Sequence, residues 1–265
     1  MSSTETFAPP APVDTDGGNI TITGLRKRFG NKTVFDGFDA AIPKGRVTSI
    51  FGPNGCGKST LLNIVAGLIP ADAGTIDLGR NGTEPRTAYV FQDYRAALFP
   101  WRTAYKNIAY PLQIAGYSKT EQADRIDELA KMLGITFDLS AHPYTFSGGQ
   151  QQLTAVARSL AIQPDILFLD EPFSALDYEM TLSLRDKLQE VFQATGVTMV
   201  VVSHDLEEAV YLSDAILLLT KPPTQVASLL EYDAPRPRTL TDVASDEFNR
   251  VKAEALRIFQ SEVRR

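Results

Sequence analysis

The chain has 265 residues, a formal net charge of -6 and 43% hydrophobic residues, which is an ordinary composition for a soluble globular protein. Its length allows one large domain or one domain with a substantial insertion. The acidic balance disfavours nucleic acid as the main partner, because phosphate contacts need clustered lysines and arginines. The single cysteine excludes an intrachain disulfide. No apolar run approaches the roughly 18 residues that cross a bilayer, so any membrane role must come through a partner.

The N-terminal stretch and the segments after it differ in pattern. Residues 1–18 are rich in Ser, Thr, Pro, Ala and Gly and have no signal-peptide pattern, so we expect a disordered leader. The alternation of Ile20 and Ile22 with threonines predicts a strand, and Arg26–Asn31 is interpreted as a turn. The next predicted strands are Val34–Ile42, Thr75–Leu78 and Thr87–Phe91.

A glycine-rich loop follows the apolar run Val47–Phe51. Residues Gly52–Thr60 fit the pattern G-x-x-x-x-G-K-[ST], and apolar residues at helical spacing come after them. In this strand–loop–helix context, backbone amides and a helix N-terminus close around phosphates. We expect Lys58 to reach the β- and γ-phosphates and the Ser59 hydroxyl to bind Mg²⁺. The predicted nucleoside triphosphate site comprises Gly52, Asn54, Gly55, Cys56, Gly57, Lys58, Ser59 and Thr60.

A mostly helical block occupies the middle of the chain. Ser118 and Glu121 form a capping box at the start of a predicted helix, and Gly134 is the residue at which this helix is expected to end. Further on, Ser147-Gly148-Gly149-Gln150 directly precedes a predicted helix over Gln151–Ala161. Free backbone amides at a helix N-terminus make this a second phosphate cradle.

The second half alternates between strands and helices, which indicates an α/β fold with a largely parallel sheet covered on both faces. The predicted strands are Ile166–Leu169, Thr198–Val202 and Ala215–Leu219. The predicted helices are Met180–Ala194 and Leu206–Leu212.

Polar side chains follow two of these strands. Asp170 ends an apolar strand, where it is placed to hold Mg²⁺ through water. Glu171 comes next, where a general base would meet the attacking water. His204 follows the strand Thr198–Val202 and is placed to contact a γ-phosphate.

With these motifs in this order, residues 20–219 resemble the ATPase subunit of an ABC transporter. The resemblance implies a P-loop NTPase fold: a RecA-like parallel core, an antiparallel β-subdomain and an inserted helical subdomain. After the leader, the expected division is 19–93 for the β-subdomain and first part of the core, 94–163 for the helical subdomain, 164–222 for the second part of the core, and 223–265 for a C-terminal strand, linker and helix.

The same resemblance assigns further roles around the nucleotide. Gln92 would be the Q-loop glutamine, touching Mg²⁺ or the attacking water, and His204 would be the switch histidine. Phe29 would stack on adenine; it stands where tyrosine is common, so stacking survives without a phenolic hydroxyl contact. The implied cofactors are ATP and Mg²⁺.

The resemblance also implies a head-to-tail dimer, because each phosphate site needs donors from the other chain. Ser147, Gly148, Gly149 and Gln150 would form the signature that binds ATP held by the opposite subunit. Asp177, in the D-loop Ser174–Asp177, would cross the dimer interface. Phe146 replaces the commoner leucine at the start of the signature, which leaves the Ser-Gly-Gly chemistry intact.

Several of these residues have plainer interpretations. Phe29 and Trp101 could be core aromatics, and Gln92 could be an ordinary polar residue at a strand end. His204 could be a satisfied structural histidine. Cys56 lies near a helix N-terminus, which could lower its thiol pKa and make it oxidisable; the alternative is a small residue that fills the loop.

Two segments resemble the nitrate/sulfonate/taurine-type import ATPases in particular. Phe99–Thr103 contains their Pro-Trp-Arg stretch, and an aromatic anchor there would suit a groove that receives a helix of a membrane permease, docking near Gln92–Arg102. Pro235–Arg238 matches their Pro-Arg-Pro-Arg element, although taken alone it reads as an extended solvated linker. Lys221–Thr224 departs from their Pro-Gly-Arg-like turn. A last helix is expected to bury Phe248, Val251, Ala255, Phe259 and Val263, with Arg264 and Arg265 at its C-terminal end.

The sequence therefore predicts the ATPase subunit of a bacterial ABC importer for a small solute such as nitrate or a sulfonate. The expected partners are a second ATPase subunit, a polytopic permease and an external solute-binding protein, at the cytoplasmic face of the membrane. The alternatives are a soluble ABC ATPase that drives assembly or remodelling, and the ATPase of an exporter.

Overall fold

The computed structural model describes residues 19–79, 84–174 and 176–264. The expected leader, residues 1–18, lies outside the described residues, and so do Ala175 of the expected D-loop and Arg265 of the last helix.

A three-stranded antiparallel sheet comes first, in the order β2-β1-β4. Its strands are β1 (Asn19–Phe29), β2 (Lys32–Pro43) and β4 (Ala73–Asp77). The predicted turn at Arg26–Asn31 is wrong, because β1 continues to Phe29, which pairs with Lys32 across a tight turn. Arg26 and Arg28 face solvent here, whereas Lys27 is buried and donates to the Pro70 carbonyl and to Asp72. The methylene groups of Lys27 thus fill a buried position in this strand, as an apolar side chain would.

A six-stranded sheet forms the centre of the molecule, in the order β5-β6-β7-β3-β8-β9. The strands β5, β6, β7, β3 and β8 are parallel, and β9 runs antiparallel to β8. Their bounds are β3 (Val47–Phe51), β5 (Thr87–Val90), β6 (Ile166–Asp170), β7 (Thr198–Val202), β8 (Ala215–Leu219) and β9 (Val226–Glu231). Every residue of β3, β6, β7 and β8 is buried, as expected for parallel strands covered on both faces. The carboxyl ends of β3, β7 and β6 are neighbours, which brings the residues after them together.

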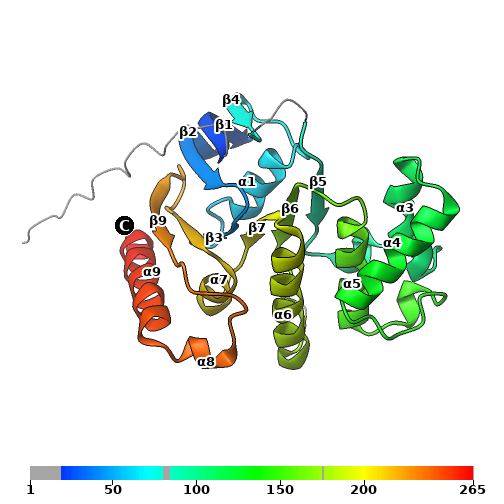
Figure 1. Cartoon of the computed structure of the whole chain (residues 1–265). Helices are drawn as coiled ribbons and strands as arrows, with labels where there is room; N and C mark the ends of the chain where they lie inside the picture. The colour runs from blue at the N-terminus through cyan, green and yellow to red at the C-terminus, as the bar shows by residue number, and fades with distance from the viewer. Residues whose placement is uncertain (1–18, 80–83, 175, 265) are drawn as a thin grey trace, which may run out of the picture.

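Helices cover both faces of this sheet, and a separate helical group stands beside β5 (Figure 1). The helices are α1 (Lys58–Val65), α2 (Tyr94–Ala97), α3 (Ala104–Ile114), α4 (Lys119–Met132), α5 (Gly148–Leu160), α6 (Tyr178–Thr195), α7 (Leu206–Leu212), α8 (Leu240–Val243) and α9 (Asp246–Arg264). The capping box of Ser118 and Glu121 is confirmed, and so are the predicted bounds of α7.

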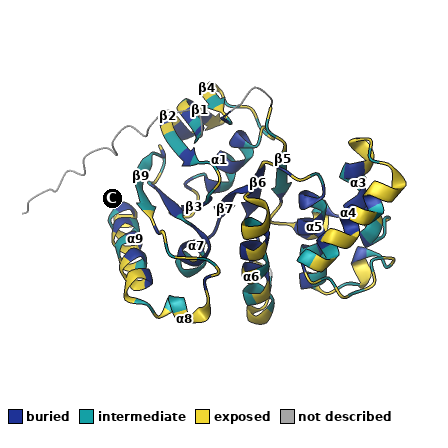
Figure 2. Cartoon of the chain, viewed as in Figure 1, coloured by how far each residue is buried: buried dark blue, intermediate teal, exposed yellow. Residues whose placement is uncertain are grey.

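Two apolar clusters lie on opposite faces of the central sheet. The first packs α1 and the antiparallel sheet against one face, through residues such as Leu61, Phe35 and Phe168. The second packs α6, α7 and α9 against the other face and continues into α3–α5. The buried strands between the two helix layers show this plainly in Figure 2. The edge where β3, β6 and β7 end is therefore built on a rigid, doubly covered sheet.

The Pro-Arg-Pro-Arg segment is not a solvated linker. The Arg238 side chain is 1% exposed and donates to the carbonyls of Tyr211, Ser213 and Tyr232. Arg236 and Arg238 both pair with Asp214, at 2.7 and 3.1 Å. Two guanidinium groups thus satisfy carbonyls that the C-terminal end of α7 leaves without helical partners, and so bind the tail to the core.

The last helix, α9, buries a different stripe from the one expected. Phe248, Val251 and Ala255 are buried as predicted, but Ile258 and Glu262 complete the stripe, and Val263 is exposed. With 3.6 residues per turn, Val263 falls about a quarter of a turn away from this stripe. Phe259 is half-buried, and its ring lies 5.3 Å from that of Phe51, at the end of β3. The tail therefore contacts the strand that carries the glycine-rich loop.

Candidate nucleotide-binding site

The glycine-rich loop leaves β3 and enters α1 through backbone conformations that favour glycine. Gly55 and Gly57 have φ of +73° and +101°, and a Cβ on Gly57 would lie 2.5 Å from a methyl group of Val34. Gly57 is also the N-cap of α1 and has no side-chain cap, so the first amides of the helix are left for a ligand. Lys58 is buried, and its ammonium donates to the carbonyls of Gly52 and Pro53 at 2.9 and 3.2 Å.

A pocket of about 340 Å³ lies over this loop. It is lined by Phe29, Lys32, Val34, Asn54, Gly55, Gly57, Lys58, Ser59, Thr60 and Glu171. Phe29 lines the pocket and is 51% exposed, so the interpretation of Phe29 as a core aromatic is wrong. Lys32 was not singled out in the sequence; within the described part of the chain, its ammonium has no hydrogen-bond or ion-pair partner. It lies 3.9 Å from the point where a Cβ of Gly55 would be.

Cys56 belongs to the floor of the loop rather than to this pocket. Its side chain is fully buried, and burial raises the pKa of the thiol above its ordinary value, with the Lys58 charge opposing that shift. The interpretation that the helix N-terminus lowers the thiol pKa of Cys56 is therefore wrong. The Thr224 hydroxyl donates to the Cys56 carbonyl at 2.5 Å, so the segment Lys221–Thr224, noted for its unusual sequence, fastens the loop from behind.

Ser59, which lines the pocket, is hydrogen-bonded to Asp170, which lines a neighbouring cavity together with Tyr89 and Gln92. The Ser59 hydroxyl donates to Oδ1 of Asp170 at 2.8 Å, and the Tyr89 hydroxyl donates to Oδ2 at 3.1 Å. Burial raises the pKa of the Asp170 carboxyl, and these two hydrogen bonds oppose that effect. A hydroxyl and a carboxylate side by side at a phosphate loop are hard oxygen ligands, which fit Mg²⁺ together with phosphate oxygens.

Glu171 follows in a constrained conformation. Its φ is +44°, a region that non-glycine residues rarely adopt. The Glu171 amide donates to the Val202 carbonyl, and the Ser174 amide and hydroxyl donate to the Glu171 carbonyl. Oε2 of Glu171 lies 2.9 Å from Nε2 of Gln92 and 3.4 Å from Nδ1 of His204. Gln92 and His204, which follow β5 and β7, therefore converge on one carboxylate oxygen of Glu171, which follows β6 between them.

The remaining predicted residues, from Ser147 to Gln150 and Asp177, contact neither this pocket nor the Glu171 carboxylate. Ser147 caps α5 and forms a capping box with Gln150, and Asp177 caps α6 by accepting from the Met180 amide at 2.9 Å. Gly149 is buried against Met180: a Cβ there would meet Cε at 2.1 Å. Within one chain, the structure joins the loop, Asp170, Glu171, Gln92 and His204, and it leaves the Ser147–Gln150 motif apart from them.

This geometry agrees with comparisons against known proteins. Residues 35–174 match the family model described as ABC transporter. The chain belongs to the ABC transporter family. It is 43% identical over 203 residues to the nitrate import ATP-binding protein NrtC of Synechococcus elongatus, covering 74% of this chain and 30% of that protein. It is 36% identical to an uncharacterised ABC transporter ATP-binding protein of Methanocaldococcus jannaschii, over 92% of both. The chain thus spans under a third of the nitrate relative and nearly all of the archaeal one.

A solved ABC cassette has the same architecture. The cassette MJ0796, described as a dimeric post-hydrolysis state bound to ADP and Pi, superposes with a TM-score of 0.70 at 28% identity. The match covers 82% of this chain and all of that one. The ABC cassette fold, with a parallel core and a separate antiparallel sheet, is therefore confirmed for this chain.

The aromatic segment after Gln92 lies at the surface of this ABC cassette. Trp101 is 72% exposed, so its interpretation as a core residue is wrong. Its ring lies 5.5 Å from that of Phe99, and Arg102 stacks on Tyr110 at 4.6 Å. The segment therefore presents a supported aromatic side chain to solvent.

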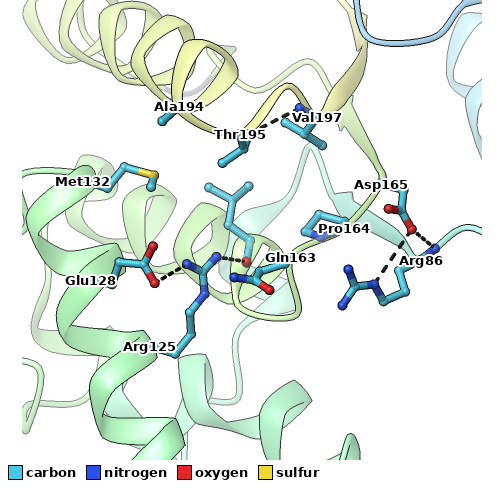
Figure 3. Close-up of a pocket in the computed structure, with 11 residues that line it drawn as sticks. Arg86, Arg125, Glu128, Met132, Gln163, Pro164, Asp165, Ala194, Thr195 and Val197 are labelled. Atoms are coloured by element: carbon cyan, nitrogen blue, oxygen red, sulfur yellow. Dashed lines mark hydrogen bonds and ion pairs between the residues drawn. The ribbon is translucent and has the colours of Figure 1, made fainter.

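Another cavity, of about 440 Å³, lies between α4, the end of α5 and the end of α6 (Figure 3). Its two arginines are already engaged: Arg125 donates to the carbonyls of Leu160 and Ala161 and pairs with Glu128, and Arg86 pairs with Asp165. The Arg125 contacts join α4 to the end of α5, and the Arg86 contact joins the segments that precede β5 and β6. Both arginines therefore have structural roles.

Proposed function

We propose that this chain is the ATP-binding and ATP-hydrolysing subunit of an ABC importer, which powers uptake of a small solute through a separate membrane permease. The observation that carries the proposal is the carboxylate of Glu171, held by Gln92 and His204 beside the phosphate loop. A general base has to be fixed within hydrogen-bond reach of the water that it activates.

Phe29 would contact the adenine of the nucleotide, and the residues of the glycine-rich loop would contact its phosphates. Phe29, exposed at the rim, would stack on adenine. The amides of the loop from Asn54 to Thr60 would donate to phosphate oxygens, helped by the N-terminus of α1. Lys58 would leave the Gly52 and Pro53 carbonyls to reach the β- and γ-phosphates.

The Ser59 hydroxyl would bind Mg²⁺ and Asp170 would hold it through water, while Gln92 would touch Mg²⁺ or the attacking water. When bound, Mg²⁺ would neutralise charge that develops on the phosphate oxygens. The side chains themselves provide the geometry, because Ser59 already fixes Oδ1 of Asp170 at 2.8 Å.

Glu171 would accept the proton of the attacking water. Gln92 orients its carboxylate, and His204, 54% exposed at the side-chain level, is free to turn toward a γ-phosphate. The strained backbone of Glu171 is held by β7 through Val202, which is the kind of support that such strain requires.

A second copy of the chain would complete the site. Ser147, Gly148 and Gln150 sit at the N-terminal end of α5, away from the pocket of their own chain. In a head-to-tail dimer they and Asp177 would face the partner's phosphates. The dimeric form of the related cassette MJ0796 supports this arrangement.

The permease would dock on Gln92–Arg102, where Trp101 is exposed. No helix in the ranges 19–79, 84–174 and 176–264 is long and apolar enough to span a membrane. In the proposal, binding to the permease holds the chain peripherally, at the cytoplasmic face of a membrane. Likeness to the nitrate import protein supports a small anion as the solute. A sulfonate-like solute and an external solute-binding protein are further parts of the proposal.

The proposed ATPase activity is tested by measuring ATP binding and ATP hydrolysis by the purified chain. We expect Mg²⁺-dependent ATP hydrolysis that Lys58→Ala abolishes together with tight ATP binding, since the ammonium supplies the phosphate contact. Lys119→Ala, at an exposed position of α4, is the matched control. A chain that binds no ATP would refute this part.

The importer part is tested by capture of partners. Tagged Glu171→Gln protein with Mg²⁺-ATP is used on detergent-solubilised membranes, with Trp101→Ala in parallel. We expect a polytopic membrane protein whose capture depends on Trp101, and solute uptake by the reconstituted pair. Capture of soluble proteins alone would instead indicate an assembly or remodelling ATPase, and outward transport would indicate an exporter.

A further inference from the structure

Tyr89 lies beside the proposed metal site, although no motif includes it. It is the third residue of β5, and in the parallel pairing of β5 with β6 it stands opposite Phe168. Asp170 is two residues beyond Phe168, so Tyr89, Phe168 and Asp170 project from the same face of the sheet. That is the face covered by α1, which begins at the phosphate loop.

The Tyr89 ring packs against two other aromatic rings. Its centroid lies 4.6 Å from that of Phe91 and 6.3 Å from that of Phe168. The half-buried ring thus has little freedom to move, and its hydroxyl is fixed 3.1 Å from Oδ2 of Asp170.

The two oxygens of Asp170 are therefore fixed from opposite sides. Ser59 donates to Oδ1, and Tyr89 donates to Oδ2. Asp170 is only 7% exposed, so most of its hydrogen bonding has to come from protein groups such as these two hydroxyls. Without the Tyr89 hydroxyl, Oδ2 would lose this donor, and the carboxylate would be free to rotate away from Ser59.

We propose that Tyr89 is a positioning residue for the metal-binding carboxylate: it orients Asp170 so that Oδ1 faces Ser59 and the metal. This inference rests on the proposed function, because it assumes that Asp170 serves Mg²⁺. Outer partners of metal ligands orient them, and their loss typically lowers metal affinity by about 10- to 100-fold.

The test is the Tyr89→Phe variant of the full chain, which removes one oxygen and keeps both ring contacts. Nucleotide affinity is measured at equilibrium with Mg²⁺ and again with EDTA, and the ratio of the two affinities reports the coupling between metal and nucleotide. The control is Tyr117→Phe, a half-buried tyrosine whose hydroxyl bonds to no residue in the described part of the chain. Thermal melting of each variant reports folding.

We expect Tyr89→Phe to reduce this ratio by about tenfold, with unchanged affinity in EDTA, an unchanged melting curve and no effect of Tyr117→Phe. A wild-type ratio in Tyr89→Phe, or an equal loss of affinity with and without Mg²⁺, would overturn the inference about Tyr89. A wild-type chain that shows no Mg²⁺ dependence would instead overturn the proposed function. The two failures are therefore distinguishable.

Discussion

The side-chain amide of Gln92 donates to Oε2 of Glu171 at 2.9 Å. Gln92 follows β5 and opens the segment that leads into α2 and α3, whereas Glu171 follows β6 in the core. One hydrogen bond thus joins the proposed base to the segment proposed to meet the permease. A movement of that segment would break or form the hydrogen bond that holds the Glu171 carboxylate.

This contact predicts a specific defect in Gln92→Ala. We expect turnover to fall by about tenfold, since a hydrogen bond to a charged group is worth roughly 1.5 kcal/mol or more, with ATP affinity almost unchanged. The matched control is Gln113→Ala, at an exposed position of α3. Equal loss of kcat in both variants would contradict the role of Gln92.

Lys32 is expected to contribute to nucleotide binding, because its ammonium lies over the loop at Gly55 without a partner among the described residues. Lys32→Ala should weaken ATP binding by about threefold at low salt, as for an exposed ionic contact. The difference should shrink as salt is raised. Isothermal titration at two salt concentrations checks this, and an effect independent of salt would argue against an ionic contact.

Arg238 is expected to carry much of the stability of the C-terminal segment. Arg238→Met would leave several carbonyls of the α7 end and part of the Asp214 charge without their donor. We expect the free energy of unfolding to fall by about 3 kcal/mol. Arg250→Met, at an exposed position of α9, should change it by less than about 0.5 kcal/mol. Urea denaturation measures both; a midpoint for Arg238→Met equal to that of wild type would show that the buried guanidinium is dispensable.

Cys56 is expected to resist alkylation in the folded protein. Its pKa is raised by burial, so the reactive thiolate is scarcer at neutral pH than in a free thiol, and the side chain is inaccessible. Iodoacetamide labelling at about pH 7.5 should be slow and should accelerate on unfolding. Rapid labelling of the native chain would mean that the loop opens.

The sequence predicted best where a pattern is strictly local. The strands Thr198–Val202 and Ala215–Leu219 have the predicted bounds, because short apolar runs between turn residues identify buried parallel strands. The glycine-rich loop was recognisable because its chemistry needs fixed residues at fixed spacing.

The sequence predicted less where pairing between distant segments decides the outcome. Tyr89 reaches Asp170 only through the register of β5 on β6, and Lys32 reaches the loop only because β1 and β2 form a tight hairpin. Arg238 looked like a solvated charge, yet its burial depends on carbonyls at the end of α7, which no pattern around Pro235 reveals.

Glu171 is proposed to act as the base of an ATPase that works as a dimer. The most direct measurement is the mass of Glu171→Gln in solution by light scattering, with Mg²⁺-ATP and without nucleotide, alongside its rate of hydrolysis. We predict a dimer only with Mg²⁺-ATP, and turnover at least about 100-fold below wild type. A monomer under both conditions, or turnover at the wild-type rate, would contradict the claim.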